Sequence, residues 1–237
     1  MKRIVTLDIA KAICIILVVI GHYIPDNSPD WYVLMRTFIY SFHMPLFMFA
    51  SWFIYMATRR EEGYGQFIWK KFKRLMVPYF STSVIVITIK LLTQGNAYVE
   101  NPVTVMSYLK MLYCPEAGYF LWFIWALWWM FVLVPLFKNA RQRLILLVIG
   151  LLLAYMPFQV TTIFCLQEFK RMLVFFALGV VLAEQHALIW SYVKHYTYVI
   201  YLLFVGAEAV YLTDFSTWGG VRKVNSVSWD CSHNLFF

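Results

Sequence analysis

Apolar residues gather along the chain into long runs that short polar segments separate. The runs approach the ~20 residues with which an α-helix crosses a bilayer, and they lack the alternating pattern of membrane β-strands. Such a pattern predicts an all-α protein, a polytopic transmembrane helix bundle with about seven spans. The predicted spans are residues 7–25, 35–58, 77–93, 118–138, 143–160, 170–186 and 195–213.

The composition excludes an ordinary soluble enzyme. Of the 237 residues, 62% are hydrophobic and only 14% are charged, and no stretch between the apolar runs is long enough for a soluble catalytic domain. We therefore expect one membrane domain over residues 1–213. Residues 214–237 are predicted to form a polar tail, because Gly219, Gly220 and mixed polar residues interrupt the helical pattern.

Basic and acidic residues alternate between successive loops of this chain, whose net charge is +8. By the positive-inside rule, the alternation places the N-terminus in the cytoplasm. The expected partner of the positive charge is the lipid bilayer, and we expect no nucleic acid. The basic residues of the predicted cytoplasmic side are Lys2, Arg3, Arg59, Arg60, Lys70, Lys71, Lys73, Arg74, Lys138, Arg141 and Arg143.

Four of these residues belong to the segment QFIWKKFKRLMV, residues 66–77. Its aromatic and aliphatic side chains are mixed with cations, which favours a helix lying at the cytoplasmic interface. Pro78 is then expected to begin the next span.

The run LDIAKAICIILVVIGH, residues 7–22, carries two polar groups on one apolar stripe. A helix turns about 100° per residue, so Lys11 and His22 share nearly one face, roughly 16 Å apart along the axis. Asp8 precedes Lys11 by three residues, where an ion pair can orient the lysine. Two interpretations stay open: a lysine that reaches the headgroups beside an interfacial histidine, or two functional groups, of which the imidazole accepts a proton.

A second histidine and an aromatic stretch extend the candidate site. His43 lies in the second span near Pro45, whose ring frees a backbone carbonyl. It is either a hydrogen-bonded core residue or part of a polar cavity. In YFLWFIWALWW, residues 119–129, the rings form an interfacial belt, or Trp122 and Trp125 form a wall of a substrate pocket. No cluster of metal ligands is present, so no metal is expected.

Five segments in this order resemble the membrane acyltransferase 3 family, in its branch similar to fucose O-acetyltransferases. They are LDIAKAICIILVVIGH, FHMPLFMFAS, KFKRLMVPYF, LWFIWAL and FFALGVVLAE, and the resemblance covers residues 4–212. It implies an enzyme, an O-acyltransferase that moves an acyl group, commonly acetyl, from cytoplasmic acetyl-CoA to a hydroxyl of an envelope or exported carbohydrate. Acyl-CoA is then a donor substrate, and no bound cofactor is expected. The resemblance further implies a multi-pass protein of the cytoplasmic (inner) membrane.

The resemblance also implies roles for individual residues. His22 corresponds to the general base that takes the proton of the acceptor hydroxyl, and Lys11 to the basic residue that precedes it in the family motif. Lys71 and Arg74 correspond to a basic pair that, with Lys11, holds the phosphates of CoA. His43 is expected to line the acceptor pocket or to stabilise the oxyanion.

Three features depart from the family pattern. Lysine stands where arginine is commonest at positions 11 and 71, and Trp52 stands where a glycine usually follows Ser51. Family members have about ten spans, so this chain is expected to be C-terminally truncated. Two alternative functions stay open: a transporter or exporter of a glycan or lipid-linked intermediate, and a noncatalytic membrane remnant. Nothing in the sequence indicates the oligomeric state.

Overall fold

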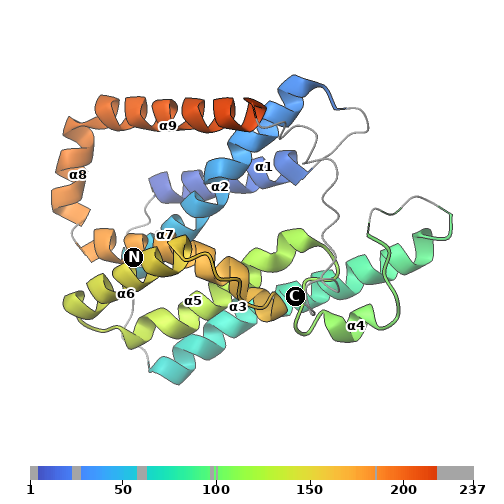
Figure 1. The fold of residues 1–237 in the computed structure, drawn as a ribbon. Coiled ribbons are helices and arrows are strands. Elements are labelled where there is room, and N and C mark those ends of the chain that lie inside the picture. The colour runs from blue at the N-terminus through green and yellow to red at the C-terminus, as the bar shows by residue number, and fades with distance from the viewer. Residues whose placement is uncertain are drawn as a thin grey trace. The chain divides into compact units, whose positions relative to one another are not determined.

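The computed structural model describes residues 5–22, 28–57, 63–96, 99, 101–184 and 186–217, and every regular element in these ranges is helical (Figure 1). The predicted all-α class is therefore confirmed. Three single-turn 3₁₀ segments, η1 Tyr119–Leu121, η2 Val134–Leu136 and η3 Ile163–Cys165, adjoin longer helices. The α-helices are α1 Val5–His22, α2 Asp30–Ala57, α3 Tyr64–Thr93, α4 Ser107–Lys110, α5 Trp122–Leu133, α6 Ala140–Tyr155, α7 Leu166–Glu184, α8 His186–His195 and α9 Thr197–Thr217.

Several of these helices are long and apolar enough for a bilayer. Among the described residues, three segments meet both criteria: Asp30–Phe53, Tyr64–Thr93 and Tyr119–Leu136. Ala12–Gly21 and Thr197–Thr213 are shorter apolar helices. The protein is thus a helical membrane protein, and the number of its membrane crossings stays a prediction.

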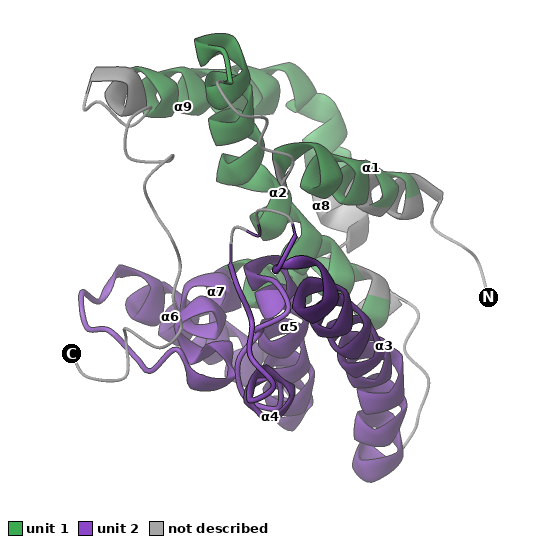
Figure 2. Cartoon of the chain, turned by 90° about the vertical axis from the view of Figure 1, so that its right-hand side faces the viewer, with its two compact units in different colours: residues 1–59, 175–227 green, residues 60–174, 228–237 purple. Residues whose placement is uncertain are grey.

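The chain divides into two compact units, which Figure 2 colours separately. Unit 1 comprises residues 1–59 and 175–227, and unit 2 comprises residues 60–174 and 228–237. Most of the tail predicted for residues 214–237 lies outside the described residues. That boundary and the predicted membrane domain 1–213 remain predictions.

In unit 1, α2 packs against α1, α9 and the second half of α7. Gly179 of α7 lies so close to α2 that a Cβ atom there would come within 2.6 Å of the carbonyl oxygen of Phe49. Small residues allow such close helix contacts in membranes. Trp52, at the position where the resemblance leads one to expect glycine, is 2% exposed and packs on Phe176 with ring centroids 4.8 Å apart. The indole therefore fills the interior of unit 1.

In unit 2, α3 is a single helix of 30 residues that continues through Pro78. The expected change of helix at this proline is therefore wrong. A proline inside a helix removes one hydrogen bond, because it has no N–H to donate. Met76 and Tyr79, on either side of Pro78, are fully buried in one hydrophobic cluster, and this packing offsets the missing bond.

Candidate active site

The end of α1 is held by side chains of α2. The Nε of Arg36 donates a hydrogen bond to the carbonyl oxygen of Gly21 at 2.9 Å, and the Tyr40 hydroxyl donates to the same oxygen at 3.3 Å. One turn earlier on α2, the Tyr32 hydroxyl donates to the carbonyl of Ile20 at 3.1 Å. The last carbonyls of a helix have no partner within it, so these bonds satisfy groups that otherwise need water.

Arg36 is the main residue that the sequence analysis missed. Its side chain is 6% exposed, and its guanidinium carbon lies 5.6 Å from the centroid of the Tyr40 ring. One feature of the sequence could have indicated Arg36: it lies inside an apolar run, with tyrosines four residues before and after it, at positions 32 and 40. Charged residues inside membrane helices are rare, and they mark functional sites.

His43 belongs to the same stripe of α2 as Arg36 and Tyr40. Its side chain is 1% exposed, its Nδ1 lies 2.7 Å from the carbonyl oxygen of Ile39, and its ring meets the Tyr40 ring edge to face at 5.1 Å. A carbonyl only accepts, so Nδ1 carries a proton, and in the neutral ring Nε2 then keeps its lone pair. The structure thus places His43 inside unit 1, in contact with the tyrosine that holds Gly21.

The remaining candidates of unit 1 belong to α1. Asp8, Lys11 and His22 all fall within this one helix, so the predicted helical relation between Lys11 and His22 holds for the backbone. Their side chains lie outside the described residues. Their roles stay predictions.

A second polar pair in unit 1 also escaped the sequence analysis. The Ser41 hydroxyl of α2 lies 2.8 Å from both carboxylate oxygens of Glu208, which belongs to the apolar helix α9. Rings of α2 and α9 meet beside it, where Phe42 and Phe204 have centroids 5.8 Å apart. The presence of a carboxylate within an apolar helix could have indicated this pair from the sequence.

In unit 2, the predicted donor-binding residues lie on the first half of α3. Lys71 Nζ lies 3.8 Å from the centroid of the Phe131 ring and 5.4 Å from that of Phe67. Arg74 and Lys73 are exposed, and Lys73 Nζ lies 5.1 Å from the centroid of the Trp69 ring. Lys71 and Lys73 therefore border aromatic faces, a contact that stabilises a charge next to apolar surface.

A shallow apolar cavity of about 360 Å³ opens on the same part of α3. The stacked rings of Trp69 and Phe72 form one side, and Trp128 of α5 meets Phe72 edge to face with centroids 5.4 Å apart. Tyr64 ties the two helices together by donating to the carbonyl of Val132 at 2.8 Å. The cavity is lined by Tyr64, Gly65, Ile68, Trp69, Phe72 and Trp128.

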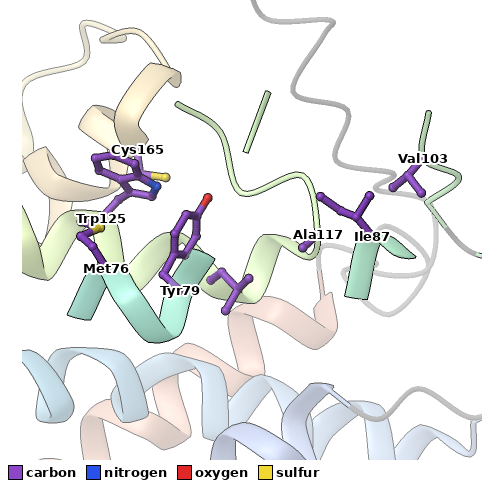
Figure 3. Close-up of a cluster of buried hydrophobic side chains, with 8 residues drawn as sticks. Met76, Tyr79, Ile87, Val103, Ala117, Trp125 and Cys165 are labelled. Carbon is purple, nitrogen blue, oxygen red and sulfur yellow. The ribbon is translucent and has the colours of Figure 1, made fainter. Parts of the chain in front are cut away.

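The two predicted substrate-wall tryptophans lie at the hydrophobic cluster of unit 2. Trp125 is 7% exposed and belongs to the cluster, whereas Trp122 is half-buried and packs against it. In Figure 3, Trp125 lies beside Met76 and Cys165, and Tyr79 stands between them and the other end of the cluster. This placement makes Trp125 a core residue, and its predicted contact with substrate stays a prediction.

Backbone strain adjoins the same cluster. Phe164 and Cys165 both have positive φ angles, of 56° and 54°, which residues other than glycine rarely adopt. The N–H of Phe164 donates to the carbonyl of Tyr113 at 2.7 Å, and Trp129 Nε1 donates to the carbonyl of Phe164 at 3.2 Å. These bonds hold the strained turn in place.

Metal ligands do not gather within the described part of the chain. No group of three or more His, Cys, Asp or Glu side chains there is arranged to hold an ion.

Comparison with known proteins gives matches over most of this chain. A family model described as an acyltransferase domain matches residues 4–235. The nodulation protein NolL of Mesorhizobium japonicum is 28% identical over 200 residues, which are 81% of this chain and 52% of that protein. The nodulation protein NolL of Sinorhizobium fredii is 28% identical over 190 residues, 77% of this chain and 50% of that protein. The chain thus spans about half the length of these relatives, and no solved structure matches it.

Proposed function

Because this chain belongs to the acyltransferase domain family, we propose that it acts as a membrane O-acyltransferase, with acetyl-CoA as the donor. The acceptor is a hydroxyl of an envelope or exported carbohydrate. The protein is proposed to be a multi-pass protein of the cytoplasmic membrane. The observation that carries the proposal is the family match over nearly the whole chain; the placement of Lys11 and His22 on the single helix α1 supports it.

The chemistry assigned to His22 is general base catalysis. Its imidazole takes the proton of the acceptor hydroxyl while the hydroxyl oxygen attacks the thioester carbonyl carbon. The new C–O bond forms, the C–S bond breaks, and the imidazolium returns the proton to the departing thiolate of CoA. A positioned general base contributes about 10²- to 10⁴-fold in rate.

Binding of the donor phosphates is assigned to basic residues. Lys11, oriented by Asp8, is one of them. Lys71 and Arg74 lie three residues apart on α3, where their positive charge suits an anionic ligand. Lysine offers a point charge in place of the bidentate fork of arginine, so donor affinity depends on several such contacts together.

The acceptor side is assigned to His43, Trp122 and Trp125. His43 either lines the acceptor pocket or stabilises the oxyanion of the tetrahedral intermediate. The lone pair on its Nε2 accepts a sugar hydroxyl in the first role, whereas the second role requires a protonated Nε2. Half-buried Trp122 offers a face on which a sugar ring stacks, and Trp125, packed in the hydrophobic cluster, supports that wall from the core.

The test is transfer of labelled acetyl from acetyl-CoA to envelope glycans by membranes that contain this chain. His22→Gln should lower transfer by about 10²- to 10⁴-fold at equal amounts of protein. His195→Gln is the matched control, because His195 is exposed and packs on its neighbour Tyr196. Full transfer by the His22 variant would refute the assigned base.

Membranes that also contain the remaining half of a NolL relative separate two further outcomes. Transfer that requires the second half would assign activity to the longer protein. No transfer with or without it, at normal insertion of the chain, would refute the acyltransferase function.

One observation favours a second candidate, an exporter of a glycan or lipid-linked intermediate. Glu208 places a carboxylate on an apolar helix, where such groups serve ion and substrate pathways. An exporter requires an ion gradient and no acyl-CoA. Transport into vesicles that persists without acyl-CoA and stops when the gradient is abolished would support it.

A further inference from the structure

The carbonyl of Gly21 is the acceptor of two side chains, and it immediately precedes His22. Arg36 and Tyr40 lie one turn apart on α2 and converge on this one oxygen at 2.9 and 3.3 Å. Two donors on a single carbonyl restrict the rotation of the peptide unit that joins Gly21 to His22. A bond to either donor alone leaves that peptide unit freer to tilt.

Gly21 of α1 lies close to two side chains of α2. A Cβ atom there would lie 3.4 Å from Cε2 of Tyr40 and 3.5 Å from Cγ2 of Ile39, which is ordinary contact. The Tyr40 ring thus packs directly on α1, and its hydroxyl reaches the carbonyl. Buried His43 meets this ring edge to face, with ring centroids 5.1 Å apart.

An arginine is energetically unfavourable at this position if it serves only to donate a hydrogen bond to the last carbonyls of α1. Burial of a guanidinium in an apolar helix pair carries a large desolvation penalty, whereas a tyrosine closes the end of a membrane helix without one. Tyr32 already does so at the carbonyl of Ile20. The arginine adds a charge-assisted bond, a complement to the negative end of the α1 dipole, and a planar group with a defined direction.

We propose that Arg36 and Tyr40 are positioning residues for His22. They hold the carbonyl of Gly21 and thereby set the direction in which α1 presents the imidazole. This inference rests on the proposed role of His22 as general base. Neither residue touches the reacting atoms, so their effect is on the rate of the chemical step and not on binding of the donor.

The kinetic test compares variants of the full chain in lipid nanodiscs, together with the second half of a relative if transfer requires it. Arg36→Met should lower kcat by about 10- to 100-fold, since small displacements of a catalytic group have effects of this size. The KM for acetyl-CoA should change by less than about twofold, because Lys11 lies about three helical turns before Gly21 and the other two donor residues belong to α3. Arg36→Lys should recover part of kcat, because its ammonium can still donate to the carbonyl of Gly21. Tyr40→Phe should lower kcat less than Arg36→Met does.

Arg143 supplies a matched control in unit 2. It is likewise buried, at 7% exposed, and its Nε donates to a backbone carbonyl, that of Phe137, at 3.0 Å. Arg143→Met removes an equivalent bond far along the chain from His22. It should reduce the yield of folded protein and leave kcat per folded molecule unchanged. Equal losses of kcat in Arg36→Met and Arg143→Met would overturn the positioning role.

A second measurement tests whether Arg36 positions His22 even if the chain transfers no acetyl group. Nitrogen-15 NMR of labelled histidines follows the imidazole of His22, assigned by its loss in His22→Gln. Arg36→Met should change the chemical shifts of its ring nitrogens and broaden its signal, because the ring direction is less fixed, and Arg143→Met should change neither. An inactive chain with this response refutes the proposed function and keeps the positioning inference. A His22 signal unaltered by Arg36→Met overturns the inference itself.

Discussion

The α1/α2 pair of unit 1 and the α3/α5 pair of unit 2 are both built from apolar helices, yet different forces hold them. In the α1/α2 pair, Arg36 and Tyr40 of α2 donate hydrogen bonds to the carbonyl of Gly21 in α1. Aromatic packing dominates the second pair, where Tyr79 and Trp125 meet edge to face with centroids 5.8 Å apart.

The difference separates two kinds of constraint. Ring packing acts through contact area and tolerates small shifts of the backbone, whereas a hydrogen bond of 2.9 Å fixes one atom against another. A chemical group that needs an exact direction is better placed on the first kind of contact. We therefore expect substitutions in the core of unit 2 to change stability, and substitutions around Gly21 to change rate.

The largest expected effect is on the aromatic core of unit 2. Trp125→Ala removes a buried indole and should lower the free energy of unfolding by about 3–5 kcal/mol. Unfolding with sodium dodecyl sulfate in mixed micelles measures this change. Trp122→Ala is the matched control with a smaller loss, because Trp122 is half-buried. A stable Trp125→Ala protein with a raised KM for the acceptor would instead make Trp125 a substrate contact.

Close packing in unit 1 gives the next effect. Gly179→Ala places a Cβ atom within 2.6 Å of the carbonyl oxygen of Phe49, so α2 and α7 must move apart. Overpacking of this kind lowers stability by about 1–3 kcal/mol. Gly206→Ala in α9 is the control, since a Cβ there meets nothing within 4 Å. Equal free energies of unfolding for the two variants would show that α2 and α7 are not in close contact at Gly179.

The Ser41–Glu208 contact should have a modest effect. Ser41→Ala removes the hydroxyl that lies 2.8 Å from the carboxylate, and polar contacts between membrane helices average about 0.6 kcal/mol. A double-mutant cycle with Glu208→Gln measures the coupling between the two residues. A coupling of several kcal/mol would contradict the modest contribution expected of this contact.

The smallest expected effect is at Gly21 itself. Gly21→Ala leaves the carbonyl and both donors in place, and its new methyl group fits in ordinary contact with Tyr40. Stability should change by less than about 0.5 kcal/mol, and transfer should stay within about twofold of the unmodified chain. A large loss of transfer would mean that steric contact, and not the shared hydrogen bonds, holds this helix end.

Much of the fold was accessible from the hydrophobic pattern. Each α-helix of 12 or more residues overlaps a predicted span, because the length of an apolar run is a local property of the chain. The continuation of α3 through Pro78 was not accessible. A proline lowers the local preference for helix, and only the burial of Met76 and Tyr79 in one cluster compensates for it.

Some residues of the candidate site could likewise be predicted from the sequence, and others could not. The sequence indicated Lys11 and His22, because their spacing and the resemblance are both readable along one helix. The sequence did not indicate Arg36. An arginine near the start of an apolar run can be buried or can reach the lipid headgroups, and the sequence pattern is the same in both cases. The partner of Arg36, the carbonyl of Gly21, lies 15 residues earlier and comes near only when α1 and α2 pack.

The sequence by itself determined that this is a helical membrane protein of the acyltransferase family, roughly where its longer apolar helices lie, and which two residues of α1 share a face. Only the tertiary structure decided which side chains are buried and what they bind. In α5 every residue is apolar, so its pattern does not distinguish buried Trp125 from half-buried Trp122 and Trp128. Hydropathy and helical period are set by neighbours in sequence, whereas burial and hydrogen bonding depend on residues that only packing brings together.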